Sequence, residues 1–213
     1  MKLLSFGILL FAMSFCGLGD RIAKLRGDSP SSNSSNSSSN SSTTKPGGGD
    51  SVEKPTLTSS QQTIVDGGDK VTWDDQGINW TLPKGWKKMN SGKETFNYSS
   101  PDQAFLLVNI SPMQGSFPVD VSIKAYYDSS IEQIKNGKYE KARMLEIDGV
   151  KGVEFTETMP EDKDGPRRHQ WLGYRTYQGQ VQMLNVMLST KGSNFEKHRD
   201  DFPAILYSMK IGK

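Results

Sequence analysis

The chain has 213 residues and a formal net charge of +2, from 26 lysines and arginines against 24 aspartates and glutamates. From residue 63 to the end the two signs balance at twenty each, which argues against a nucleic-acid-binding domain with its usual basic excess. The single cysteine, Cys16, excludes an intrachain disulfide, so the fold has to be stabilised by its core alone.

The first residues are typical of a secretory signal peptide. Lys2 supplies a positive charge, and Leu3 to Phe15 form an apolar segment too short to span a bilayer. The sequence Met13-Ser14-Phe15-Cys16 resembles a bacterial lipobox, in which the cysteine is linked to diacylglycerol and becomes the mature N-terminus. Phe15 is larger than the residue usually found before that cysteine. We predict a signal peptide over residues 1–19, with Cys16 as the site of lipidation.

Other interpretations of this segment stay open. Cleavage at Ala12-Met13-Ser14 or at Gly17-Leu18-Gly19 would release a free secreted protein. A second alternative is that the segment is not cleaved and remains as an N-terminal anchor. A buried helix is disfavoured because nothing nearby in the sequence would cover it.

Residues 20–62 are predicted to form a disordered tether. From Ser29 to Gln62 the chain is rich in Ser, Asn, Thr and Gly and has hardly an apolar side chain to bury. A flexible chain of these 34 residues spans roughly 30 Å, enough to hold a domain clear of a membrane. A plain secreted linker or a glycosylated stalk is equally compatible. Six asparagines begin Asn-x-Ser/Thr sequences: Asn33, Asn36, Asn40, Asn79, Asn97 and Asn109.

Residues 63–213 have the length of one ordinary domain. The sequence of the first half of this segment predicts strands. Val71 to Asp74 and Ile78 to Leu82 flank a turn, and the second segment alternates apolar and polar residues. Glu94 to Tyr98 and Ala104 to Ser111 are predicted as the next two strands of an antiparallel set.

A helix and two hairpins follow. Ile123, Tyr127, Ile131 and Ile134 recur at helical spacing, and Asn136-Gly137 ends the amphipathic helix that opens at Asp120. Hairpins are predicted from the following segments: 141–147 with 150–158, where Val153 and Phe155 share a face, and 168–177 with 180–190.

The C-terminal segment predicts a last helix. Ser193 and Glu196 have the spacing of a capping box, so the helix is expected to begin there and to be kinked or split by Pro203. It would present four apolar residues to the sheet: Phe195, Phe202, Ile205 and Leu206. The order of elements indicates an α+β domain with helices packed on a mainly antiparallel sheet.

Three short segments resemble one family. They are Ile78-Asn79-Trp80-Thr81-Leu82-Pro83-Lys84-Gly85-Trp86, the hairpin that begins at Leu145, and Ile205-Leu206-Tyr207-Ser208-Met209. They resemble the PsbP-like and DcrB-like group, over about residues 71–211. The resemblance implies an α/β/α sandwich. Such folds serve the oxygen-evolving complex of photosystem II, bacterial envelope lipoproteins and a Ran-binding nucleotide-release factor, so the fold does not select a function.

Few residues suggest chemistry. His169 and His198 are the imidazoles available as bases or ligands, and both are interpreted as surface residues, His169 at a strand edge and His198 on the polar side of the last helix. The carboxylates of 161–165 suit a hard cation but lack the spacing of an EF-hand, so a solvated hairpin tip is expected. We predict no catalytic residue, no metal and no cofactor.

One strand carries a possible binding surface. The strand carries guanidinium and aromatic groups at six positions: Arg167, Arg168, Trp171, Tyr174, Arg175 and Tyr177. The residues predicted to form the surface are Arg168, Trp171, Tyr174 and Arg175. The competing interpretation is a twisted sheet with Trp171 on one face and Tyr174 on the other, one of them beneath a helix. Three further tryptophans are expected in the core: Trp73, Trp80 and Trp86.

The sequence thus favours a non-catalytic, lipid-anchored extracytoplasmic protein at the bacterial outer membrane or periplasmic face, or else a secreted one. Its partner would be the membrane, through the anchor, and an unidentified envelope protein or small ligand. The alternatives are a secreted hydrolase that uses carboxylates or His169, and an accessory protein of a photosynthetic complex. A pocket that joins two buried carboxylates, or one carboxylate and His169, would favour the enzyme. A filled sheet face with an exposed aromatic patch would favour binding.

Overall fold

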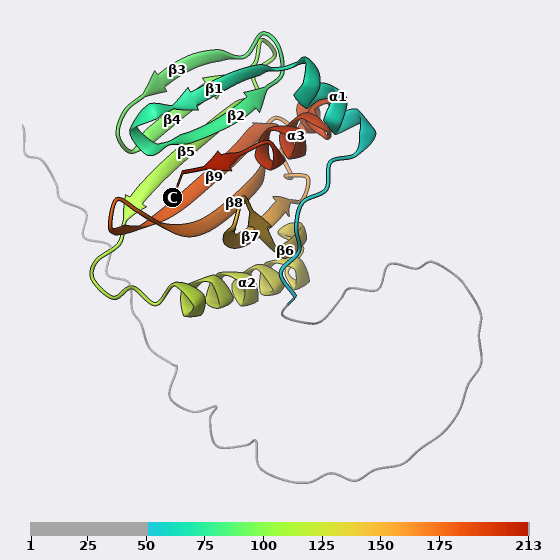
Figure 1. Cartoon of the computed structure of the whole chain (residues 1–213). Coiled ribbons are helices and arrows are strands. Elements are labelled where there is room, and N and C mark those ends of the chain that lie inside the picture. Colours follow the sequence, from blue (N-terminus) through green and yellow to red (C-terminus); the bar gives the residue numbers. More distant parts are fainter. Residues whose placement is uncertain (1–50, 213) are drawn as a thin grey trace, which may run out of the picture. The chain divides into compact units, whose positions relative to one another are not determined.

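The computed structural model describes residues 51–212. Cys16, the predicted signal peptide and most of the predicted tether lie outside the described residues. Two sheets make up the fold, a large one in the order β3-β4-β5-β9-β8-β7-β6 and a small one in the order β1-β2-β10 (Figure 1). Neighbouring strands in both sheets are antiparallel.

The elements have the following bounds. The strands are β1 Asp69–Trp73, β2 Ile78–Leu82, β3 Lys87–Ser91, β4 Thr95–Ser99, β5 Phe105–Pro112, β6 Tyr139–Ile147, β7 Val150–Glu157, β8 Pro166–Tyr177, β9 Gln180–Lys191 and β10 Lys210–Ile211. The helices are α1 Ser59–Gly67, α2 Val119–Lys135 and α3 Asp201–Tyr207, with the 3-10 helices η1 Asp74–Gln76 and η2 Gly192–His198.

Each face of the large sheet has its own core. Because side chains alternate along a strand, β8 sends Trp171 to one face and Leu172 to the other. Ile123 of α2 packs in the core that contains Leu172, whereas Ile205 of α3 packs in the core that contains Trp171. Figure 1 shows α2 along one side of the large sheet and α1, α3 and the small sheet on the other. The predicted α+β fold, an α/β/α sandwich with a mainly antiparallel sheet, is confirmed.

Most predicted elements are present. Helix α2 lies where it was predicted and ends at Lys135, with Asn136 as its C-cap; Gly137 follows with a φ of +71°, which favours glycine. Strands β8 and β9 are joined at Gln178 and Gly179, with φ of +51° and +81°, as a two-residue hairpin turn requires. Val153 and Phe155 lie in one core, as predicted.

The predicted start of the last helix is wrong. Residues from Gly192 to His198 form the 3-10 helix η2 without a side-chain cap, and α3 begins only at Asp201. Pro203 lies in the first turn of α3, where its missing N–H is not needed. The four apolar residues predicted to face the sheet are buried.

The predicted end of the tether at residue 62 is also wrong, because it falls inside α1. A capping box begins this helix: Thr58 Oγ1 accepts from the Gln61 N–H, and the Gln61 side chain accepts from the Thr58 N–H. Before it, the backbone of Glu53 is hydrogen-bonded to Met144 and Glu146 on β6. Residues 51–62 therefore belong to the folded part. No helix in residues 51–212 is long and apolar enough to cross a membrane.

Candidate ligand-binding site

A cavity of about 220 Å³ lies where β6, β7 and β8 meet the segment that contains η2 and α3. The register pairs Thr156 of β7 with His169 of β8, so both side chains lie on the same face of the sheet. Phe195 and His198 come from η2 on the opposite wall. We call this site the Arg167 cavity; Thr156, Arg167, His169, Phe195, Glu196 and His198 line it among others.

Arg167 is the buried cation of this cavity, with 6% of its side chain exposed. Its Nε donates to the carbonyl of Glu157 at 2.9 Å, and its guanidinium lies 4.1 Å from the centre of the Phe195 ring. Nη2 donates to Glu140 at 2.6 Å and Nη1 to Glu196 at 3.2 Å. These two carboxylates are 50% and 55% exposed. A fixed, buried guanidinium is thus balanced by two groups that are free to turn into solvent.

His198 lies in the wall that η2 forms opposite the sheet. It is buried, so its predicted surface position is wrong. Its ring stacks on Phe202, and it contacts the carboxylates of Asp201 at 2.9 Å and Asp102 at 3.1 Å. Burial alone would lower the pKa of His198, but the hydrogen bond to Asp201 and the charge of Asp102 outweigh it and raise the pKa above 6.5. The imidazolium form is therefore favoured beside the cavity.

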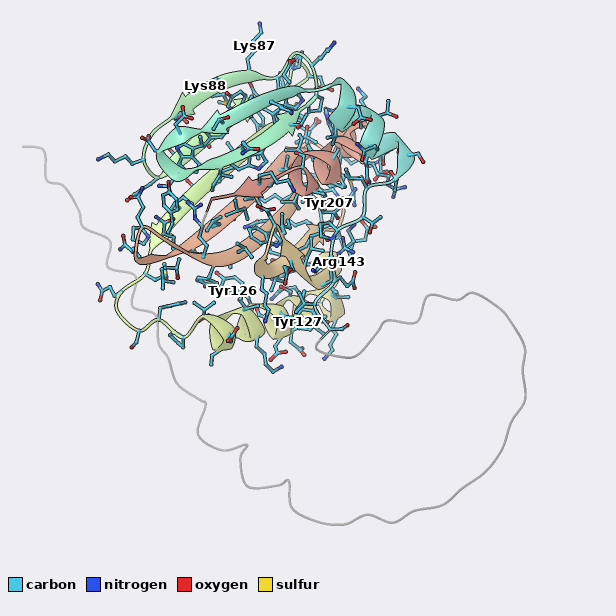
Figure 2. All side chains as sticks on the ribbon, in the orientation of Figure 1. Lys87, Lys88, Tyr126, Tyr127, Arg143 and Tyr207 are labelled. Carbon is cyan, nitrogen blue, oxygen red and sulfur yellow. The ribbon has the colours of Figure 1, made fainter. Side chains whose placement is uncertain are left out.

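A second group of charges lies on the same face of the sheet, and we call it the Glu154 cluster: Glu154, Arg143, Tyr207 and His169. Glu154 is 1% exposed and accepts from Arg143 Nε and from the Tyr207 hydroxyl, each at 2.5 Å. Figure 2 labels Arg143 on β6 and Tyr207 on α3, with Tyr126 and Tyr127 on α2. Burial raises the pKa of Glu154, but the contacts with His169, Arg143 and Tyr207 together lower it to about 2. This carboxylate is an ion in the folded domain.

His169 joins the Glu154 cluster to the cavity. Its Nε2 lies 3.0 Å from Glu154 Oε1, a close contact that lacks the alignment of a hydrogen bond. Its Nδ1 lies 3.1 Å from the hydroxyl of Thr156. Only 2% of His169 is exposed, so the predicted position at the surface or a strand edge is wrong.

The four residues of the predicted binding surface are not brought together at the surface. Trp171 is completely buried on the α3 side, and its indole N–H donates to the carbonyl of Leu145. Tyr174 lies in the core on the α2 side. Arg175 is buried against the carbonyl of Gly212, and Arg168 is half-buried beside Glu157. The competing interpretation, with Trp171 and Tyr174 on opposite faces, describes the structure.

The remaining candidates are placed as follows. Trp73 and Trp80 are buried in the core, and Trp86 is packed against it. The Trp73 indole donates to the carbonyl of Gly92, whereas the Trp80 indole N–H has no partner among the described residues. Residues 161–164 are exposed. Within residues 51–212, no group of His, Cys, Asp and Glu side chains is arranged to hold a metal ion.

No protein-family model and no curated protein matches the sequence. The fold is similar to the solution structure of cyanobacterial PsbP from Synechocystis, with 14% identity and a TM-score of 0.44, over 68% of this chain and 94% of that one. It is also similar to LpqN of Mycobacterium tuberculosis, described as involved in cell envelope biogenesis, with 13% identity and a TM-score of 0.48, over 68% and 86%.

A third similar structure is a protein of Bacteroides thetaiotaomicron, with 13% identity and a TM-score of 0.44 over 69% of this chain. The match covers 49% of that protein, so the chain spans about half its length. The PsbP-like resemblance predicted from the sequence is thus confirmed as a similarity of fold. It carries no information about activity.

The two shifted pKa values predict how stability depends on pH. Glu154 has a lowered pKa, so its stabilising contribution is present above about pH 4.5 and is lost as the pH falls toward 2. His198 has a raised pKa, so its contribution is present below about pH 6.5 and is lost as the pH rises through the folded-state value. We expect the loss of stability caused by His198→Gln to be larger at pH 5.5 than at pH 9, measured by urea unfolding. A loss that is the same at both values would contradict the ion pairing of His198.

Proposed function

We propose that this protein is a lipid-anchored, extracytoplasmic binding protein of the cell envelope, which takes a small ligand in the Arg167 cavity and performs no catalysis. The observation that carries the proposal is the state of Arg167. Its guanidinium is held in place by the Glu157 carbonyl and the Phe195 ring, but two half-exposed glutamates neutralise it. Polar groups fixed in advance and aimed into a cavity are what a specific ligand site needs.

The proposed location depends on the N-terminal sequence. A positive residue and an apolar segment precede Cys16, and a stretch that is rich in Ser, Asn, Thr and Gly from Ser29 onward lies between Cys16 and the domain. A lipidated cysteine followed by a flexible polar chain would let the domain reach a ligand away from the membrane. The outer membrane or the periplasmic face is the proposed site, and secretion without an anchor is the alternative.

The anchor is tested by expressing the full chain and Cys16→Ser in a bacterial host, with membrane fractionation and intact mass. We expect the unaltered chain in the membrane fraction with a mass increase of the size of a diacylglycerol group, and Cys16→Ser without either. Phe15→Ala is the matched control, because a small residue before the cysteine should process at least as well. If the unaltered chain and Cys16→Ser are both released, each with the mass of its unmodified sequence, this host attaches no lipid.

The cavity is tested independently by NMR on the domain. A panel of anionic, neutral and cationic small molecules is titrated while the imidazole signals of His169 and His198 are followed. Binding in the cavity should shift these signals and leave the α2 side of the sheet unchanged. If no member of the panel shifts them, the cavity is not a ligand site.

A second candidate function is hydrolysis. Glu154, His169 and Thr156 form a chain of carboxylate, imidazole and hydroxyl that reaches the cavity, the order of groups that activates a hydroxyl nucleophile. A pocket that joins a buried carboxylate and His169 is the arrangement expected of the enzyme, so this candidate meets that criterion. We rank it second because the contact between Glu154 and His169 Nε2 lacks the alignment of a hydrogen bond, so the imidazole is not oriented as a base. Hydrolysis of p-nitrophenyl acetate by the domain, lost in Thr156→Val, would support the enzyme and contradict the binding protein.

A further inference from the structure

We infer that the ligand group taken by the Arg167 cavity is an oxyanion, a carboxylate or a phosphate, which replaces Glu196 on Arg167. This inference rests on the proposed function and names its ligand class. It comes from the charge of the walls, the unused donors of Arg167 and the size of the cavity.

The walls carry more positive than negative groups. Three permanent cations, Lys141, Arg167 and Arg199, line the cavity against two carboxylates, Glu140 and Glu196. Two imidazoles lie beside them. The imidazoles have carboxylates of their own, Glu154 beside His169 and both Asp102 and Asp201 beside His198. The lining itself carries one more permanent cation than carboxylate, so a group that takes the place of Glu196 on Arg167 has to be negatively charged to preserve this balance.

Arg167 has N–H groups that no described residue accepts from. A guanidinium has five N–H groups in one plane, and three of those of Arg167 have partners among the described residues. The Nη1 to Glu196 distance of 3.2 Å is long for a charge-assisted bond, which is typically about 2.8 Å. Glu196 is also shared with Arg199, again at 3.2 Å. Glu196 is therefore the weaker of the two bound carboxylates and the one that a ligand would replace.

The rest of the site keeps Arg167 in position during this exchange. The Glu157 carbonyl holds Nε, and the Phe195 ring lies against the guanidinium. Neither contact involves Glu196. A carboxylate or phosphate has the geometry to accept two parallel bonds from a guanidinium fork.

The size of the cavity limits what enters it. A volume of about 220 Å³ is smaller than the roughly 300 Å³ at which pockets for drug-sized ligands begin. The walls of phenylalanine and proline add an apolar surface beside the charges. The cavity thus suits one charged group with a few attached carbons, either a free small anion or the charged end of a larger molecule.

The experiment is a titration of the domain with inorganic phosphate at pH 6, followed by the His169 and His198 signals, for the unaltered domain and three variants. Glu196→Gln removes the competing charge and should tighten binding by about threefold to tenfold, because one charge-assisted bond no longer has to be broken. Arg167→Lys keeps the charge but loses the fork and should weaken binding by about tenfold or more. Glu132→Gln, which removes an equally exposed charge from α2, should change little.

The outcomes separate the two proposals. If Glu196→Gln binds phosphate no better than Glu132→Gln does, the exchange on Arg167 is wrong. If phosphate does not shift the imidazole signals but neutral or cationic members of the panel do, the inference that the ligand is an oxyanion is wrong and the proposed binding function stands. Because Glu196 is exposed, its variant tests the inference even if Arg167→Lys does not fold. Binding of phosphatidylglycerol vesicles that is also tightened by Glu196→Gln would identify a lipid headgroup as the source of the anion, whereas binding of free phosphate alone would identify a soluble one.

Discussion

Glu154→Ala is expected to lower the free energy of unfolding by about 3 to 5 kcal/mol, because removing one partner of a buried ion pair leaves the other groups uncompensated. Arg143 would lose the buried one of its two carboxylate partners and keep only the exposed Glu53, and the Tyr207 hydroxyl would lose its acceptor. The side chain of Glu154 is 1% exposed, so water cannot readily take its place. Urea unfolding at pH 7, with the midpoint and slope analysed together, measures the loss.

Glu53→Ala is the matched control for this prediction, because Glu53 pairs with the same arginine at 2.7 Å but is 52% exposed. An exposed ion pair contributes less than about 1 kcal/mol. We expect Glu154→Gln to fall between the two alanine variants, since it keeps the volume and some hydrogen bonding while it loses the charge. Equal losses for Glu154→Ala and Glu53→Ala would mean that the Glu154 cluster does not stabilise the fold.

The sequence predicts the sheet well because its strands alternate in polarity and its turns carry glycine. On β7 the apolar Val153 and Phe155 indicate one core, and the structure places both there. The same alternation misleads for the residue between them. A glutamate in phase with the opposite face looks like a solvated position, but β7 lies inside the sheet and α3 covers that face. Only the position of the C-terminal helix turns Glu154 into a buried ion.

The histidines were misinterpreted for the same physical reason. His169 lies on a strand between two others, so its exposure depends on what covers the sheet, and His198 depends on a 3-10 turn where a longer helix was predicted. The sequence places Arg167 on a strand rich in guanidinium and aromatic groups, but its partners Glu140 and Glu196 are distant in the sequence, so its burial is not predicted. The contacts of Arg167 with Glu140 and Glu196 join residues that are far apart in the sequence, and a single sequence does not specify them.

The start of the fold was missed because composition outweighed local pattern. Thr58 and Gln61 have the spacing of a capping box, which marks a helix start, but they follow a long polar stretch. Glu53 is fixed by backbone bonds to β6 and by Arg143, which no local rule predicts. A prediction from composition places the end of the tether where apolar residues begin. The folded part begins earlier, where the backbone first forms hydrogen bonds to the sheet.

Trp171→Ala is expected to cost about 3 to 5 kcal/mol, because a large side chain would be removed from a core that cannot close around the space. The indole is completely buried and lies over two glycines, Gly173 on its own strand and Gly152 on β7. A Cβ atom at Gly173 would approach the indole to 2.3 Å, and one at Gly152 to 2.6 Å. Gly173 is thus explained chiefly by the space that the indole takes, whereas a Cβ at Gly152 would also meet the carbonyl oxygen of Leu172 at 2.4 Å.

Gly173→Ala is therefore expected to destabilise the domain by about 1 to 3 kcal/mol through overpacking. Much of this penalty should vanish once the indole is gone, so the double variant with Trp171→Ala should lose less than the sum of the two single losses. Gly67→Ala is the control, since a Cβ at that position has no neighbour within 4 Å and should cause no loss. Simple additivity in the cycle, measured by urea unfolding, would mean that the indole does not set the size of residue 173. Coupling between the two sites would show that Gly173 makes room for the indole of Trp171.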